Sequence, residues 1–168
     1  FGSTTTNTTQ GQTTPPFWRQ ALIRNNNVKA NYFGLSVLQT FGTSIARSVV
    51  ANNIVTDFNN QNTSTARGLY FYVVGNLDVH HNSVLLTGGS AGAGRAAFFN
   101  GLVGTTAPTG WTYNMQSGVS FANNILANYG PGQVIGFQSQ STSTAYPTAT
   151  SLYSTMFSTL NNNTYYGL

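Results

Sequence analysis

The pattern of apolar and polar positions along this chain repeats one six-residue unit five times. The unit reads apolar, any residue, Asn or His, Asn, any residue, apolar, and its fourth position is Asn in every copy. A unit that returns every few tens of residues is typical of a solenoid, in which each coil of the chain stacks on the one before. The copies occupy residues 23–28, 50–55, 79–84, 121–126 and 160–165.

Between these units lie further apolar runs that read as strands. They are short, rich in β-branched or aromatic residues, and bounded by Gly, Asn and Ser, which favours β-structure. No segment carries an amphipathic helical stripe with caps. The sequence therefore predicts an all-β chain with at least two strands per coil. The runs are Gly34–Leu38, Gly68–Val74, Ala96–Phe99 and Val134–Phe137.

The unit also predicts a corner in the backbone. Side chains alternate faces along a strand, so its first and fourth positions would face opposite ways without a turn between them. The third position is suited to that turn, because Asn tolerates left-handed backbone. The fourth-position amides then point inward and form hydrogen bonds with one another and with the turn backbone. They therefore avoid the free-energy cost of burying a polar group without a partner. The predicted inward Asn ladder is Asn26, Asn53, Asn82, Asn124 and Asn163.

The outer positions of the unit predict two apolar stacks inside the solenoid. One would consist of Ile23, Val50, Val79, Phe121 and Leu160, and the other of Val28, Val55, Val84, Leu126 and Tyr165.

The spacing of the ladder positions predicts where the chain leaves the stack. Successive ladder Asn residues are 27, 29, 42 and 39 residues apart. The two long intervals indicate loop insertions, which we place at Gly101–Ser117 and Ser139–Ser158. Residues 1–16 form a Thr/Gly/Gln-rich lead or linker, and residues 17–168 form the solenoid domain. Phe17 and Trp18 are placed to cover its first open end.

Composition narrows the possible partners. Only 5% of the 168 residues are charged, and the only acids are Asp57 and Asp78. The six bases are scattered singly, whereas nucleic-acid-binding proteins cluster theirs, so we expect no nucleic acid as a partner. No apolar stretch approaches the ~20 residues of a membrane span. The chain starts at Phe1 without a signal peptide, so we expect a processed product or a fragment of a larger parent chain.

The repeats resemble those of a known family. Leu77–Val84, Phe121–Leu126 and Asn162–Tyr166 are similar to repeats of the right-handed parallel β-helix, the pectate-lyase-like family with inward Asn ladders. The resemblance covers about residues 20–168. It implies a right-handed parallel β-helix solenoid of four to five coils.

The amino-acid sequences of these repeats are also similar to those in large secreted surface proteins of Bacteroidetes. Many of those proteins are adhesins exported by the type IX secretion system. This second resemblance implies an extracellular or cell-surface location, with the secretion machinery as a partner. The usual C-terminal sorting domain of those proteins does not occur in this sequence, so the expected export route rests on the style of the repeats.

Enzymes of the β-helix family act on polysaccharides with acidic side chains. Lyases of that kind need acidic calcium ligands and a basic residue, and inverting hydrolases need paired carboxylates. Asp57 and Asp78 are 21 residues apart at different phases of their coils, which favours two solvated surface acids. Because these two are the only acids, we expect no catalytic residues and favour a protein that is not an enzyme.

The adjacent His80 and His81 are the other candidates for chemistry. Neighbours on a strand face opposite ways, so we expect no joint metal site from them. His81 takes the position of a turn Asn, and His80 with Asp78 forms at most a lone acid–base dyad. We expect neither a metal nor another cofactor.

Aromatic and basic residues suggest a binding site more readily than the acids and histidines suggest a catalytic or metal site. Tyr70 and Tyr72 flank Phe71 and face outward if Phe71 faces inward. Arg67 and Arg95 are 28 residues apart, close to one coil, so they can stack on one face and contact an anionic glycan, although exposed edge arginines are the commoner finding. The candidate ligand-binding residues are Tyr70, Tyr72, Arg67, Arg95, Trp111 and Tyr113.

The insertions carry the remaining aromatic candidates: Trp111 and Tyr113 in the first, Tyr146 and Tyr153 in the second. Exposed rings suit stacking on sugars. The alternative, equally weighted, is that these rings cover the core beneath long loops.

These features predict a non-catalytic extracellular or cell-surface module for adhesion, glycan binding or structural support, with a polysaccharide or cell-surface glycan as partner. One alternative is a polysaccharide lyase or glycosidase. Another is the subunit of an extracellular filament or fibre, assembled by end-to-end self-association, because both ends of a β-helix expose unpaired strand edges.

Overall fold

The fold is almost entirely β-strand. A computed structural model describes residues 20–56, 66–88, 94–103, 116–141 and 153–167, and within them one short helix spans residues 153–156. Every pair of neighbouring strands in these ranges is parallel. The all-β class predicted from the repeat is confirmed.

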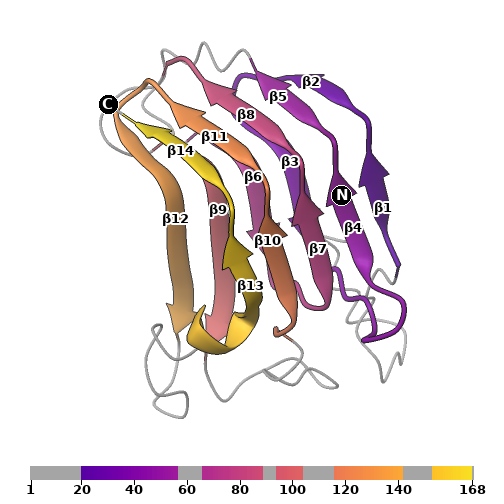
Figure 1. The fold of residues 1–168 in the computed structure, drawn as a ribbon. Helices are drawn as coiled ribbons and strands as arrows, with labels where there is room; N and C mark the ends of the chain where they lie inside the picture. The colour runs from indigo at the N-terminus through magenta and orange to yellow at the C-terminus, as the bar shows by residue number, and fades with distance from the viewer. Residues whose placement is uncertain (1–19, 57–65, 89–93, 104–115, 142–152, 168) are drawn as a thin grey trace, which may run out of the picture.

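The described strands form three sheets, and Figure 1 shows the strands of each sheet side by side. The first sheet contains, in spatial order, β1 (Leu22–Arg24), β4 (Ser48–Ala51), β7 (Leu77–His80), β10 (Val119–Ala122) and β13 (Phe157–Asn161). The second contains β2 (Asn27–Lys29), β5 (Ile54–Thr56), β8 (Ser83–Leu86), β11 (Ile125–Asn128) and β14 (Thr164–Gly167). The third contains β3 (Phe33–Leu38), β6 (Arg67–Tyr72), β9 (Gly94–Val103) and β12 (Gly132–Ser141).

The chain visits the first, second and third sheets in turn and then returns to the first, one strand further along. This order is the arrangement of a parallel solenoid. The six-residue unit supplies two of the three strands in a coil, because its corner separates a strand of the first sheet from a strand of the second. The sequence predicted at least two strands per coil, and the structure has three.

The corner has the predicted backbone conformation. The third position of the unit has a φ between 51° and 59° in all five copies. This left-handed turn allows the apolar first position and the fourth-position Asn to lie on the same side of the chain, as the pattern predicted. The residues concerned are Asn25, Asn52, His81, Asn123 and Asn162.

The core is built from side chains that stack in register across coils. Val50, Val79 and Phe121 of the first sheet are at most 1% exposed. In the second sheet the corresponding residues are Val55, Val84 and Leu126, which are at most 2% exposed. The third sheet adds a column of Val37, Phe71, Phe99 and Phe137, so all three sheets contribute to one core.

Parts of the predicted boundaries fall differently in the structure. Strand β9 continues to Val103 and β12 to Ser141, so both strands extend into the ranges expected to be insertions. Residues 104–115 and 142–152, and the lead at 1–16, lie outside the described residues. Within the described part of the chain, no helix has the length and apolar character needed to cross a membrane.

Candidate functional site

The five fourth-position asparagines form a hydrogen-bonded series. In each of the four steps, the backbone N–H and the Nδ2 of one Asn donate to the Oδ1 of the Asn in the following coil, at 2.8–3.1 Å. Asn53, Asn82 and Asn124 are at most 1% exposed. Because their polar atoms are used inside the stack, these residues hold the coils together and are not a ligand site. We call Asn26, Asn53, Asn82, Asn124 and Asn163 the asparagine series.

The outward side of the third sheet gathers aromatic rings from three strands. The ring centroid of Tyr70 lies 5.4 Å from that of Phe33 on β3 and 5.8 Å from that of Phe98 on β9. Tyr32 packs edge-on against Phe33 at 4.3 Å. Tyr32 and Phe33 are each 40% exposed, so the row is open to solvent at this end.

Two arginines lie beside this row. Arg67 and Arg95 are register partners on β6 and β9, so the 28-residue spacing does place them on one face. The Arg67 Cζ lies 4.1 Å from the centre of the Phe98 ring, within the range of a cation–π contact. We call Tyr32, Phe33, Arg67, Tyr70, Arg95 and Phe98 the aromatic–arginine face.

A glycine makes room for the second arginine. Gly136, on the neighbouring strand β12, pairs with Phe98 of β9. A Cβ at Gly136 would lie 2.7 Å from the Arg95 Cδ and 3.0 Å from the Phe98 ring. The Arg95 side chain thus packs against the backbone of β12 at Gly136, where any residue with a Cβ would collide with it.

The electrostatics of this face favour an anion. Burial lowers the pKa of Arg67, and the neighbouring charge of Arg95 lowers it further. Burial also lowers the pKa of Arg95. Two half-buried guanidiniums side by side disfavour each other's charge, and a bound carboxylate would offset that cost through charge-assisted hydrogen bonds.

Tyr70 and Tyr72 both lie on the outward side of β6, while Phe71 between them is 1% exposed. Tyr70 Oη accepts a 3.3 Å hydrogen bond from the Nδ2 of Asn100. Burial raises the pKa of Tyr72, with a further contribution from Tyr70. The Oδ1 of Asn100 is buried without a hydrogen-bond partner among the described residues, so this row carries polar as well as aromatic groups.

Asp78 is engaged in a structural contact. Its carboxylate accepts a 2.7 Å bond from the Nε of Arg47, and the Arg47 guanidinium also donates to the carbonyl oxygens of Leu77 and Gly118. Asp78 was expected to be a solvated surface acid, and it is instead part of a clamp between coils. Asp57 lies outside the described residues.

The prediction that His80 and His81 face opposite ways is wrong. His81 is not on the strand, because β7 ends at His80 and His81 occupies the left-handed turn with a φ of 57°. The two rings therefore lie on one side, with their Nδ1 atoms 2.9 Å apart. Within the described ranges, no cluster of three or more potential ligands of the His, Cys, Asp or Glu type could hold a metal ion.

The insertion aromatics are only partly described. Trp111, Tyr113 and Tyr146 lie outside the described residues. Tyr153 covers the core: its ring packs 4.8 Å from that of Phe137, and its hydroxyl donates to the carbonyl oxygens of Phe99 and Gln138. For Tyr153 the structural alternative is the correct one.

The sequence missed half of the aromatic–arginine face. Tyr32, Phe33 and Phe98 were not among the candidates. Strand alternation around the buried Phe99 could have indicated an outward Phe98, since the two are adjacent. Nothing local indicates Phe33, because its place beside Arg67 depends on the register between β3 and β6.

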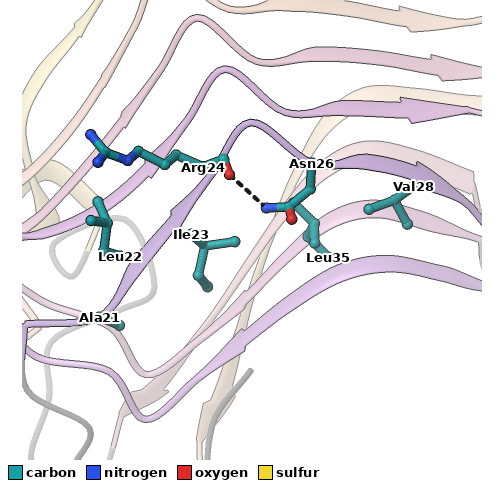
Figure 2. Close-up of a pocket in the computed structure, with 7 residues that line it drawn as sticks. All are labelled: Ala21, Leu22, Ile23, Arg24, Asn26, Val28 and Leu35. Atoms are coloured by element: carbon teal, nitrogen blue, oxygen red, sulfur yellow. Dashed lines mark hydrogen bonds between the residues drawn. The ribbon is translucent and has the colours of Figure 1, made fainter.

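A second feature lies at the N-terminal end of the stack. A cavity of about 410 Å³ opens beside β1 and β2. Figure 2 shows Ile23, Val28 and Leu35 lining it, with the Asn26 amide bonded to the Arg24 carbonyl. Most of the lining is apolar, and it is formed by the first residues of the inward stacks.

Comparison with known proteins reveals no relative. No model of a protein family, no curated protein and no solved structure matches the chain. Its function must therefore be argued from the chemistry of its surface.

Proposed function

We propose that this chain is a non-catalytic module of an extracellular or cell-surface protein that binds an anionic polysaccharide or cell-surface glycan. The observation that supports this proposal is the aromatic–arginine face, where Phe33, Tyr70 and Phe98 form a row beside Arg67 and Arg95. Aromatic rings pack on the apolar faces of sugars, and guanidiniums bind carboxylates through paired hydrogen bonds. A polymer of uronic acids offers both features.

The dimensions of the face suit a chain-like ligand. Strands in a sheet are about 4.8 Å apart, so the row from β3 through β6 to β9 extends over about 10 Å. The row follows the direction in which the coils stack. A glycan lying along it would stack on Phe33 and Tyr70 of two neighbouring coils, while Phe98, only 6% exposed, lies beneath the Arg67 guanidinium and supports it. Contact with two coils suits adhesion and structural support as well as binding.

The same proposal includes the finer description of the fold. The domain is a right-handed parallel β-helix of four to five coils, and the asparagine series is its inward ladder. The parallel sheets and the hydrogen-bonded amides support this description. The pectate-lyase-like kinship, the extracellular location and type IX export rest on the resemblance of the repeats.

A polysaccharide lyase or glycosidase is the less supported alternative. Family enzymes need several acids, and Asp78 is the only acid among the described residues and is bound by Arg47. The aromatic–arginine face has no carboxylate of its own within those residues. The arrangement therefore supports holding a glycan more than cleaving one.

Calorimetric titration with polygalacturonate, a uronic-acid polymer, tests the proposal. We expect Arg67→Gln and Tyr70→Ala each to weaken binding about tenfold, equivalent to about 1.4 kcal/mol. Arg24→Gln removes the same charge from an exposed position on β1 and should leave affinity close to that of the wild type. Binding should also weaken with salt, because the guanidiniums are partly exposed.

Two results would count against the proposal. Absence of binding by the wild type, or equal losses from Arg67→Gln and Arg24→Gln, would show that the face does not recognise this polymer. Release of cleaved product would instead establish the enzymatic alternative.

A further inference from the structure

Both histidines of the chain lie at one corner of the solenoid. His80 ends β7, and His81 occupies the left-handed turn that follows, with a φ of 57°. The turn interrupts the alternation of side chains along the strand, so the two imidazoles lie on one side. Their Nδ1 atoms are 2.9 Å apart, and their ring planes meet at 90°. Because the sequence has two His residues and no Cys, this corner holds every imidazole of the chain.

This corner departs from the repeat at two neighbouring positions. At the turn, the other four copies of the unit have Asn where this copy has His81. On the strand, the register partners of His80 are Ala51 and Ala122. Because Ala has no side chain beyond its Cβ, neither partner can cover the His80 ring. His80 is half-buried and His81 is exposed, so a small ligand can reach the pair from solvent.

Two imidazole nitrogens this close need either a shared hydrogen or a shared cation. A direct hydrogen bond places a hydrogen on one Nδ1 and a lone pair on the other. A neutral imidazole can instead carry its hydrogen on Nε2, which leaves the lone pair of Nδ1 free. With both rings in that form, the two lone pairs repel each other unless a cation binds both. Neutral imidazole is the commonest metal ligand among side chains, so a metal ion suits this position.

The separation of the two Nδ1 atoms favours one coordination geometry. At a metal–nitrogen distance of about 2.0–2.1 Å, two nitrogens 2.9 Å apart subtend an angle of about 90° at the metal. A tetrahedral site, with an angle of about 109°, would need the nitrogens about 3.3–3.4 Å apart. Zn²⁺ prefers the tetrahedral arrangement, whereas right angles are typical of the square-planar or tetragonal sites of Cu²⁺ and Ni²⁺. Of these ions Cu²⁺ binds nitrogen ligands most tightly.

We propose that His80 and His81 form a binding site for Cu²⁺, with their Nδ1 atoms as ligands at two neighbouring coordination positions. Water would occupy the remaining positions, because no third His, Cys, Asp or Glu side chain joins the pair in the part of the chain that the structure describes. The nearby carboxylate of Asp78 is held by Arg47 at 2.7 Å. The site lies on the first sheet and its corner, so the proposal is independent of glycan binding by the third sheet.

Titration of the chain with CuCl₂, followed by calorimetry and by electron paramagnetic resonance, tests the site. His81→Asn introduces the residue of the other four turns, and His80→Ala introduces that of the two neighbouring coils, so both variants should fold. We expect the wild type to bind one Cu²⁺ per chain with nitrogen ligands in its spectrum. Each variant should bind at least about tenfold more weakly, since the loss of an outer-shell partner alone costs that much.

The double variant His81→Asn/Asn162→His is the matched control. It keeps two imidazoles in the chain, and Asn162 has the same left-handed turn with a φ of 51°, but it separates the rings by two coils. We expect it to bind Cu²⁺ as weakly as His81→Asn, with circular dichroism establishing that all variants fold. Binding by the control as tight as that of the wild type would overturn the proposal. A wild type that does not bind Cu²⁺, or whose affinity neither single variant lowers, would do the same.

Discussion

A buried amide is stable only if each of its polar atoms has a partner, and Asn82 meets this condition. Its Oδ1 accepts from the backbone N–H and the Nδ2 of Asn53, at 3.1 and 2.9 Å. Its Nδ2 donates to Asn124 and to the carbonyl oxygens of Val50 and His80. One side chain thus satisfies polar groups of three coils, which explains why an amide is required at this position.

We predict that Asn82→Ala lowers the free energy of unfolding by about 2–3 kcal/mol, because buried donors and acceptors lose their partner. Asn26→Ala is the matched control, since Asn26 is exposed and only donates within the series. It should cost about 1 kcal/mol or less. Urea denaturation of both variants measures the difference, and equal losses would show that burial of the series contributes little.

At the scale of elements, the short helix at 153–156 ties β9 to β12. The Tyr153 hydroxyl donates to a carbonyl oxygen of each strand, those of Phe99 and Gln138. Burial raises the pKa of Tyr153 from its ordinary 10.0 to about 12. The folded state therefore favours the neutral phenol, which can donate, over the phenolate, which would face two carbonyl oxygens.

The pKa of Tyr153 gives a prediction at alkaline pH. A folded-state pKa above the unfolded value means that the contribution of Tyr153 to stability is complete below pH 10 and is lost as the pH rises through about 12. Tyr153→Phe should remove this part of the alkaline loss, although its stability at neutral pH is lower. Thermal unfolding between pH 9 and about 12 measures the slope. Tyr166→Phe, at an exposed site on β14, should keep the wild-type slope.

At the scale of the whole molecule, one ring joins the third sheet to the first within the core. Phe99 stacks on Phe71 at 4.7 Å and meets Phe121 and Phe157 edge-on at 5.3 and 4.9 Å. It belongs to the third sheet, and two of its neighbours belong to the first. The solenoid is thus held across its interior as well as from coil to coil.

We predict that Phe99→Ala lowers the free energy of unfolding by about 3–5 kcal/mol, the usual cost of a large cavity in a core. Phe33→Ala removes the same side chain from the aromatic–arginine face, where Phe33 is 40% exposed, and should cost about 1 kcal/mol. Equilibrium unfolding in urea compares the two. Similar losses would mean that the interior between the sheets is not a packed core.

The sequence by itself determined the corner and, in the inner coils, the inward asparagines and the two apolar stacks. At the ends of these series Asn26, Leu160 and Tyr165 are exposed, contrary to the prediction that they lie inside. The corner and the inner series follow from local rules: a left-handed φ that Asn accepts, alternation along a strand, and a repeat that returns the same residues to the same place. Alternation also sufficed to turn Tyr70 and Tyr72 outward around Phe71. Each of these features depends on neighbours within a few residues, which is why a pattern can encode them.

Only the tertiary structure decided which residues of different coils meet. Three contacts between coils depend on the register between strands. They are those of Arg67 with Phe98, Phe33 with Tyr70 and Arg47 with Asp78. That register is set by the lengths and paths of the turns between sheets, and a shift of a single residue would exchange the faces. The repeat therefore specified the inside of the solenoid, and the three-dimensional stacking specified its outer surface.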